Sequence, residues 1–286
     1  MRIAAAPFPV AAGVRLHGEI IAWTCSGVAV RHSDLVAALR DADLDEGVAR
    51  ELAPKHAFAR ACKKLSEQRI IRRVAEDGAS MKFQFTAEHR SDDRFEYTLE
   101  TLLTLDKRTG RVSCDLPGLA TSAQEHLDHA LGVRTASDVT RVIGKLFDRH
   151  ADLFPIRPQG GCYFVPDRHT GFVDRVQAML GRIGGRIRRF PVPAGTPEGD
   201  RSVKDAVASG LAALIGEHRR AIAAFGDETR GETLERAAET IRTTRLKVEG
   251  YSELLADEKA RLDRELAAAR GELRAKVERL APAVPV

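Results

Sequence analysis

The hydrophobic pattern of the first 116 residues predicts a strand, three short helices and two hairpins. A buried strand is expected over residues 18–25, a short apolar run. Apolar side chains recur three or four positions apart in three segments, which predicts helices over 32–44, 45–53 and 56–68. Two hairpins are then expected, the first with an Asp-Gly turn, from strands 70–74 with 81–85 and 95–105 with 111–116. In the second hairpin, Phe95, Leu99, Leu103 and Leu105 alternate with polar residues, which is typical of one apolar face.

A second set of elements follows a break in the pattern at residues 116–122. Helical spacing of apolar side chains predicts helices over 122–131, 136–150 and 169–185. A short apolar strand is expected over 160–166, and the basic segment 186–192 follows the last helix. Residues 191–200 are rich in proline and glycine and are interpreted as a linker.

The two sets share a pattern that repeats after 81 residues. Each contains a basic amphipathic helix, a turn and a short apolar strand, and we interpret this as an internal repeat. An ungapped alignment of residues 59–85 with 140–166 pairs Arg60 with Arg141, Lys64 with Lys145, Leu65 with Leu146 and Phe83 with Phe164. The order of elements resembles a winged helix, a fold whose third helix lies in a DNA groove.

The tail has the pattern of a coiled coil. A first helix is expected to end at Gly226, and Thr229 with Glu232 has the form of a capping box that opens a second. At about 1.5 Å per residue these helices would span roughly 38 Å and roughly 75 Å, so half of the second would lack a partner in the chain. We expect a homodimer formed through a leucine seam, with folding back on the heads or a foreign protein as the alternatives. The seam residues are Leu255, Leu262, Leu266, Leu273 and Leu280.

The expected fold class is therefore α+β, with two winged-helix-like units followed by a C-terminal helical hairpin or coiled-coil arm. The expected domains are residues 1–118, 119–192, a linker over 193–200 and the arm over 201–282.

Charge is unevenly distributed along the chain. The formal net charge is only +4, but residues 55–73 hold 7 basic and 1 acidic side chains, and residues 134–199 hold 11 and 6. Two basic segments separated by acidic sequence favour a polyanionic partner, with chance clustering as the alternative. No apolar run is long enough to predict a membrane span, so no membrane partner is expected. Four scattered cysteines without a CxxC pair are typical of free thiols in a reducing cytoplasm.

Motifs for catalysis are missing from the sequence. Neither a P-loop, a G-x-G-x-x-G, an H-E-x-x-H nor a G-x-S-x-G occurs in a usable context, so no enzyme activity and no cofactor is predicted. His126 and His129 could share a metal ion on one helix face, but we interpret them as surface or half-buried histidines.

The basic residues of the two segments are the candidate site. Lysine and arginine side chains on a helix face neutralise phosphates, and those four residues apart reach one groove. The alternatives are a helix held by ion pairs to the acidic strands and, for residues 186–189, solvation of the linker. The candidates are Lys55, Arg60, Lys63, Lys64, Arg69, Arg72, Arg73, Arg141, Lys145, Arg149, Arg186, Arg188 and Arg189.

The pattern as a whole predicts a non-enzymatic, cytoplasmic DNA-binding protein. The third helix carries no Asn or Gln apart from Gln68 at its end, so we expect duplex DNA to be bound with low sequence specificity. An assembly adaptor that binds proteins, and an RNA-binding module, remain as alternative functions.

Overall fold

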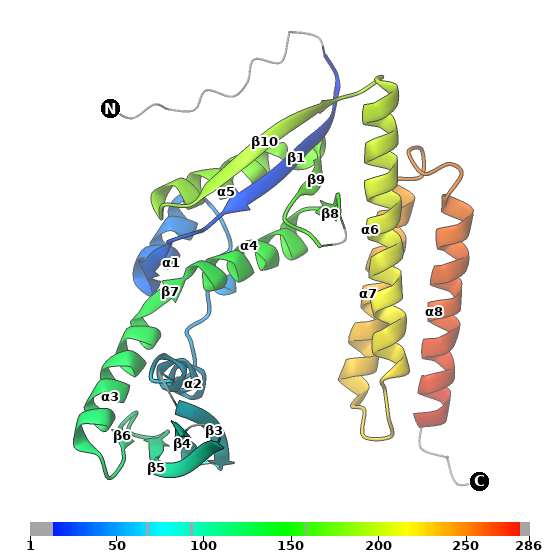
Figure 1. The fold of residues 1–286 in the computed structure, drawn as a ribbon. Coiled ribbons are helices and arrows are strands. Elements are labelled where there is room, and N and C mark those ends of the chain that lie inside the picture. The colour runs from blue at the N-terminus through cyan, green and yellow to red at the C-terminus, as the bar shows by residue number, and fades with distance from the viewer. Residues whose placement is uncertain (1–13, 67–68, 92–93, 158, 281–286) are drawn as a thin grey trace, which may run out of the picture. The chain divides into compact units, whose positions relative to one another are not determined.

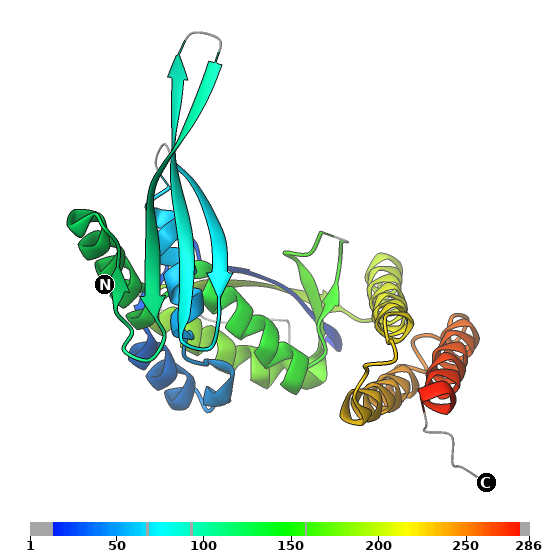
Figure 2. The same ribbon diagram turned by 90° about the horizontal axis from the view of Figure 1, so that it is seen from below.

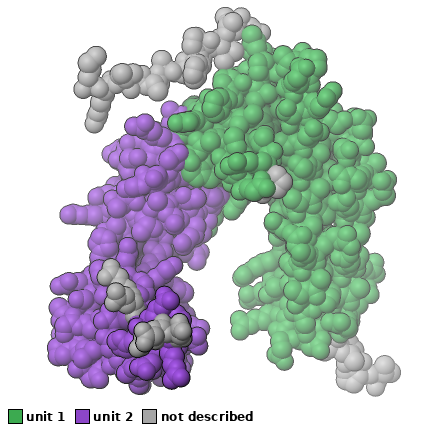
Figure 3. All heavy atoms as spheres, viewed as in Figure 1, with its two compact units in different colours: residues 1–23, 147–174, 187–286 green, residues 24–146, 175–186 purple. Residues whose placement is uncertain are grey.

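The computed structural model describes residues 14–66, 69–91, 94–157 and 159–280 (Figure 1). Helices account for 54% and strands for 24%, and the sheets are antiparallel, which confirms the α+β class. The described residues form two compact units (Figure 3). Unit 1 comprises those within 1–23, 147–174 and 187–286, and unit 2 those within 24–146 and 175–186. The units thus divide the chain at positions other than 118, 192 and 200, and the domains expected from the sequence stay a prediction.

Unit 2 contains two antiparallel sheets and most of the helices of the first half of the chain. One sheet has the strand order β3-β4-β5-β6, and the other pairs β2 with β7. The strands are β2 (Ala29–Arg31), β3 (Arg69–Glu76), β4 (Ser80–Ser91), β5 (Arg94–Asp106), β6 (Val112–Ser113) and β7 (Val133–Thr135). The helices are α1 (His32–Asp41), the 3-10 turn η1 (Glu46–Val48), α2 (Pro54–Lys64), α3 (Pro117–Gly132) and α4 (Ala136–His150), whose last four residues belong to unit 1.

One face of the β3–β6 sheet packs against α2 and α3. Phe58 of α2 lies edge-on to Phe83 of β4, with ring centroids 5.5 Å apart. The buried residues of this core come from α2, β4, β5 and α3: Ala57, Phe58, Ala61, Cys62, Met81, Phe85, Leu103, Leu105, Ala123 and Leu127. The helix and hairpin expected from the sequence are therefore confirmed as α2, β3 and β4, and they share one core.

The β4–β5 pairing contains a β-bulge. Phe85 lies opposite Thr101, whereas the next residue of β4, Thr86, lies opposite Leu99, so Glu100 is an extra residue in β5. Neighbouring residues of β4 point to opposite faces of the sheet, and so therefore do Thr101 and Leu99. Thr101 is 3% exposed and Leu99 is 57% exposed, as this change of face requires.

The bulge corrects the single apolar face expected for β5. Leu103 and Leu105 point to the core, as predicted, but Phe95, Tyr97 and Leu99 point to the opposite face. We call this second face, turned away from α2, the outer face. In Figure 2, β4 and β5 continue beyond β3 and β6 as a two-stranded hairpin.

Unit 1 combines a four-stranded sheet with three long helices. The sheet order is β10-β1-β9-β8, and β1 pairs antiparallel with β9, which brings a strand from the start of the chain beside one expected in the second winged helix. The strands are β1 (Leu16–Thr24), β8 (Phe154–Pro155), β9 (Tyr163–Pro166) and β10 (Arg186–Pro193). The 3-10 turn η2 (Asp167–His169) and the helix α5 (Thr170–Arg182) follow β9, and the residues of α5 from Arg175 on belong to unit 2. The helices α6 (Pro197–Ala223), α7 (Gly231–Gly250) and α8 (Lys259–Leu280) come last.

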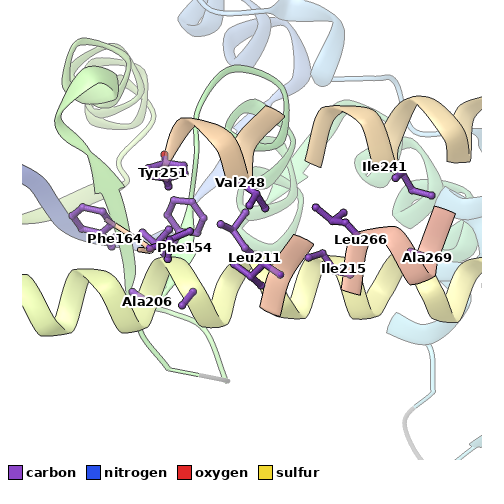
Figure 4. Packing of buried hydrophobic residues seen from close by; sticks show 14 of the residues in the cluster. Phe154, Phe164, Ala206, Leu211, Ile215, Ile241, Val248, Tyr251, Leu266 and Ala269 are labelled. Atoms are coloured by element: carbon purple, nitrogen blue, oxygen red, sulfur yellow. The ribbon is translucent and has the colours of Figure 1, made fainter. Parts of the chain in front are cut away.

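The sheet and the three helices share one apolar core (Figure 4). Phe154 and Phe164 of the sheet belong to the same cluster as Leu211 of α6, Val248 of α7 and Leu266 of α8. Gly210 of α6 makes this packing possible, because a Cβ atom there would lie 2.8 Å from the Phe154 ring. The expected linker is a tight turn, since β10 ends at Pro193 and α6 begins at Pro197.

The prediction of one long second helix in the tail is wrong. Residues 251–258 form turns, so α8 starts at Lys259 and packs against both α6 and α7. Of the leucines assigned to self-association, Leu280 is half-buried, while Leu255, Leu262, Leu266 and Leu273 are buried, at most 5% exposed. The chain itself covers the seam, which therefore gives no reason for a second copy. A homodimer stays a prediction without that support.

Asp152, between α4 and β8, joins several elements of unit 1. Its carboxylate accepts hydrogen bonds from Arg168 (2.5 Å) and from the Tyr251 hydroxyl (2.7 Å), and it lies 2.8 Å from Lys247 Nζ. Burial raises the pKa of Asp152, but the hydrogen bonds from Lys247, Tyr251 and Arg168 outweigh burial and lower it overall. The carboxylate is therefore charged in the folded protein and ties the end of α7 to the segment after α4.

Truncation after Gly250 tests the role of α8. Removing three buried leucines of α8 forfeits at least about 4.5 kcal/mol, at about 1.5 kcal/mol or more per side chain. We expect the amides of α6 and α7 to lose protection in hydrogen exchange. Unchanged protection, together with conversion of a dimer to a monomer, would restore the self-association interpretation.

The substitution Asp152→Asn tests the contribution of the ion pairs and hydrogen bonds around Asp152. Because the folded pKa lies below the usual value of 3.8, the stabilisation is present above that pH and is lost as pH falls through the folded pKa. At pH 7 we expect the variant to lose about 2 kcal/mol of unfolding free energy in urea titrations. The difference from wild type should shrink toward pH 2, and the exposed control Asp205→Asn should stay within about 0.5 kcal/mol at every pH. A difference independent of pH contradicts this account.

Candidate nucleic-acid interface

The helix α2 forms because its residues suit a helix at both ends and along one face. Pro54 occupies its first position, where a missing N–H costs nothing. Phe58 and Cys62, one turn apart, are fully buried and fix the helix on the sheet. Lys63 and Lys64 lie in the last turn, where positive charge is favoured by the helix dipole. Ala57 and Ala61 join them in the core, and the charged side chains of α2 lie on its other faces.

Arg60 of α2 does not point freely into solvent. Its guanidinium makes two hydrogen bonds, of 2.6 and 2.7 Å, to the carboxylate of Asp138 in α4. Asp138 is 8% exposed and also accepts hydrogen bonds from the backbone N–H and the hydroxyl of Thr135, both 3.0 Å long. Burial raises the pKa of Asp138, but Arg60 and Thr135 lower it further than burial raises it. The pair therefore holds α2 to the first turn of α4.

Arg60 and Arg141, equivalent in the sequence repeat, meet at this carboxylate. Arg141 Nη1 lies 3.6 Å from Asp138 Oδ1, and its side chain is 66% exposed. Lys63 and Lys64 follow Arg60 within about one turn, and Lys145 follows Asp138 by about two turns. All three lysines are exposed, and the described residues offer them no ion-pair partner within 4 Å.

We give the name α2–α4 cluster to Asp138 and five cations of the two helices: Arg60 and Arg141, which contact Asp138, and the exposed Lys63, Lys64 and Lys145. Five positive charges and one negative charge give it a net charge of +4. Arg134, 4% exposed and hydrogen-bonded to carbonyls at the end of α3, adds a buried positive charge that interacts with Asp138 and Arg60. The arrangement can attract and neutralise anionic groups at the surface of α2 and α4.

Other candidates on the first hairpin are paired with carboxylates. Arg69 makes hydrogen bonds of 2.5 and 2.8 Å to Glu100, and Arg73 lies 2.8 Å from Glu76. Lys55 is 3.5 Å from the same Glu76, which lines a surface hollow of about 260 Å³ between α2 and the sheet. Lys55, Arg69 and Arg73 therefore form ion pairs with the acidic strands, which is the alternative to phosphate contact. Arg72 is exposed on the outer face.

The candidates near residue 186 lie on a strand, not in a linker. Arg189 of β10 is bonded to Glu19 of β1 and to Asp174 of α5 within unit 1. Arg186 and Arg188 are exposed on the same strand, and Arg149 is exposed near the end of α4. Of the thirteen candidates, the structure places Arg60 and Arg141 at Asp138, and Lys63, Lys64 and Lys145 lie on the same two helices.

Sequence reasoning missed Asp138 and Arg134. Thr135 and Asp138 have the T-x-x-D spacing of a helix N-terminus, a signal that marks Thr135 as the residue before α4 and Asp138 as its capping partner in the first turn. Nothing local marks Arg134 as buried, because its partners are backbone carbonyls of α3. Across the described part of the chain, no group of three or more metal-ligating side chains is arranged around a metal position, and His126 and His129 lie on α3.

The chain belongs to DUF6744, a family of unknown function, whose sequence profile matches residues 16–283. No curated protein is significantly similar to it. The same holds for the solved structures, none of which matches significantly. Among the helices of the described residues, none combines the length and the apolar character that crossing a membrane requires.

Charge reversal separates the bonded from the exposed cation in α2. Arg60→Glu places a second carboxylate against buried Asp138, so we expect it to lower the unfolding free energy by at least about 2 kcal/mol. Lys64→Glu, one turn away and exposed, should change it by no more than about 0.5 kcal/mol. Urea unfolding of the full chain measures both, and equal stabilities would refute the structural role of Arg60.

Proposed function

We propose that the protein is a non-enzymatic DNA-binding protein that contacts phosphates through the α2–α4 cluster. The observation that carries the proposal is the meeting of both basic helices at Asp138, with Lys63, Lys64 and Lys145 exposed on the same two helices. Ammonium groups on short helical spacing neutralise neighbouring phosphates and release their counterions. Asp138 orients the two helices while cancelling only one of the five charges.

Low sequence specificity is part of the proposal. Readout of base edges commonly uses Asn, Gln or bidentate Arg side chains in the major groove. Neither α2 nor α4 carries an Asn or Gln, and Arg60 is engaged by Asp138. Contacts to the phosphate backbone of duplex DNA position a protein without selecting a sequence.

The winged-helix interpretation belongs to this proposal as well. For the winged helix expected within residues 1–118, the order α1, η1, α2, β3 and β4 supports it, with α2 as the helix that meets DNA. The helix expected over 45–53 is reduced to the 3-10 turn η1. For the second, expected within residues 119–192, the two helices α3 and α4 precede the paired strands β8 and β9, so this part has one helix fewer than the first. We further propose a cytoplasmic setting, supported by four cysteines that are all free thiols.

The double variant Lys63→Glu with Lys64→Glu tests the proposal. We expect weaker binding to duplex DNA and a plot of log affinity against log salt whose slope is smaller by roughly two units, at about 0.9 per lost phosphate contact. Lys145→Glu should add a loss of its own if α4 takes part. Electrophoretic shifts at several salt concentrations measure both.

The matched control reverses two exposed arginines of α8, Arg264→Glu with Arg270→Glu. It changes the net charge by the same amount on another part of the chain. If the control weakens DNA binding as much as the α2 variant does, the effect is one of net charge and the α2–α4 cluster is not the site. A wild-type protein that does not bind DNA at low salt refutes the function itself.

A further inference from the structure

The outer face of the β3–β5 sheet exposes a continuous apolar stripe. Phe95, Tyr97, Leu99 and Leu102 follow one another along β5 and are 53%, 56%, 57% and 44% exposed. Because the sheet packs its other face on α2 and α3, these side chains have no place in the core of unit 2. Single exposed apolar residues are common, but a row of four on one strand marks a contact surface.

Cations flank this stripe at both ends. Arg90 lies opposite Phe95, with its guanidinium carbon 5.8 Å from the ring centroid. At the other end, Gln84 pairs with both Arg72 and Leu102, so the arginine lies in the row of the last apolar residue. Neighbouring residues of a strand point to opposite faces, and both arginines pair with residues of the outer face. Arg72 and Arg90 therefore lie on the outer face.

The net charge of the outer face is positive. Lys82 lies between the core residues Met81 and Phe83 and adds a third exposed cation to Arg72 and Arg90. Two acidic side chains share this face among the described residues, Glu88 opposite Tyr97 and Asp106 opposite Ser80, so three cations leave a net positive charge there. A second copy of the same face would bring like charges together, whereas an anionic chain would be attracted.

We propose that the outer face binds the unpaired bases of a single-stranded nucleic acid, with the rings of Phe95 and Tyr97 as stacking surfaces. This inference rests on the proposed function and adds a second ligand, an unpaired strand, at a surface of unit 2 other than the α2–α4 cluster. Every base has an aromatic face, so stacking on protein rings is tolerant of sequence, while arginines and lysines beside the rings bind the backbone. In a duplex the base faces are covered by their neighbours, so only an unpaired strand can lie on these rings.

The geometry of β5 suits this ligand. Phe95 and Tyr97 are alternate residues of one strand, about 6.8 Å apart at 3.4 Å per residue, so the two rings can receive separate bases. The hairpin beyond β3 has polar side chains such as His89 and Thr98 on its opposite face, so stacking is confined to one side.

The test compares single-stranded and duplex DNA by fluorescence anisotropy, with the full chain and an oligothymidine of about 12 nucleotides. For Phe95→Ala with Tyr97→Ala we expect roughly 100-fold weaker binding of the single strand, about tenfold per ring. Binding of a duplex of equal length should change by less than about twofold, because the α2–α4 cluster is intact. A strand with 4-thiothymine should crosslink to the peptide that contains both rings.

Two further variants make the comparison specific. His89→Ala with Thr98→Ala changes the opposite face of the same hairpin and should leave both affinities unchanged. Phe95→Tyr with Tyr97→Phe keeps both rings and should bind the single strand like wild type. Circular dichroism checks that all variants are folded.

The outcomes separate this inference from the function on which it rests. If wild type binds neither DNA form, the proposed function fails. If it binds duplex but no single strand, or if Phe95→Ala with Tyr97→Ala leaves single-strand affinity within about twofold, the inference is overturned and the function stands. Loss of a dimer in that variant, with unchanged DNA binding, would identify a second copy as the occupant of the outer face.

Discussion

A buried carboxylate requires a positively charged or hydrogen-bonding partner beside it. One buried carboxylate lies near each end of α4. Asp138 lies in its first turn, in unit 2, and Asp152 lies just beyond its last residue, in unit 1. Leaving either charge unpaired would cost several kcal/mol. Their partners are consequently fixed: Arg60 brings α2 to the start of α4, and Lys247 with Tyr251 brings the end of α7 to the segment after it.

This constraint divides the basic residues into two groups with different roles. Arg60, Arg69 and Arg189 each bind a carboxylate of another element, so they hold the fold together. The exposed Lys63 and Lys64 make no such contact within the described residues, and their charge acts outward. Residues 55–73 therefore do carry an excess of positive charge. A count of basic residues along the sequence nevertheless overstates the number of cations that are exposed and not paired with a carboxylate.

The sequence predicts elements well where periodicity and turn residues agree. The helix expected over 136–150 is α4, and the Asp-Gly turn lies between β3 and β4. The sequence did not predict the break between α7 and α8 or the bulge in β5, because each of them preserves the apolar pattern. Leu255 is buried in the turn between α7 and α8, so the seven-residue spacing runs on through a break in the helix. The bulge keeps the alternation of β5 while changing the face on which it continues.

The bulge also links the charged residues to the outer face. Glu100 is the extra residue of β5, and its carboxylate accepts two hydrogen bonds from Arg69 of β3, the strand on the other side of β4. Arg69 lowers the pKa of Glu100, so this carboxylate stays charged and bonded at neutral pH. An arginine that the sequence assigns to phosphate contact thus holds the residue that turns Leu99 and Tyr97 outward. Its contribution to a nucleic-acid surface would be indirect, through the face that it orients rather than through a charge that it presents.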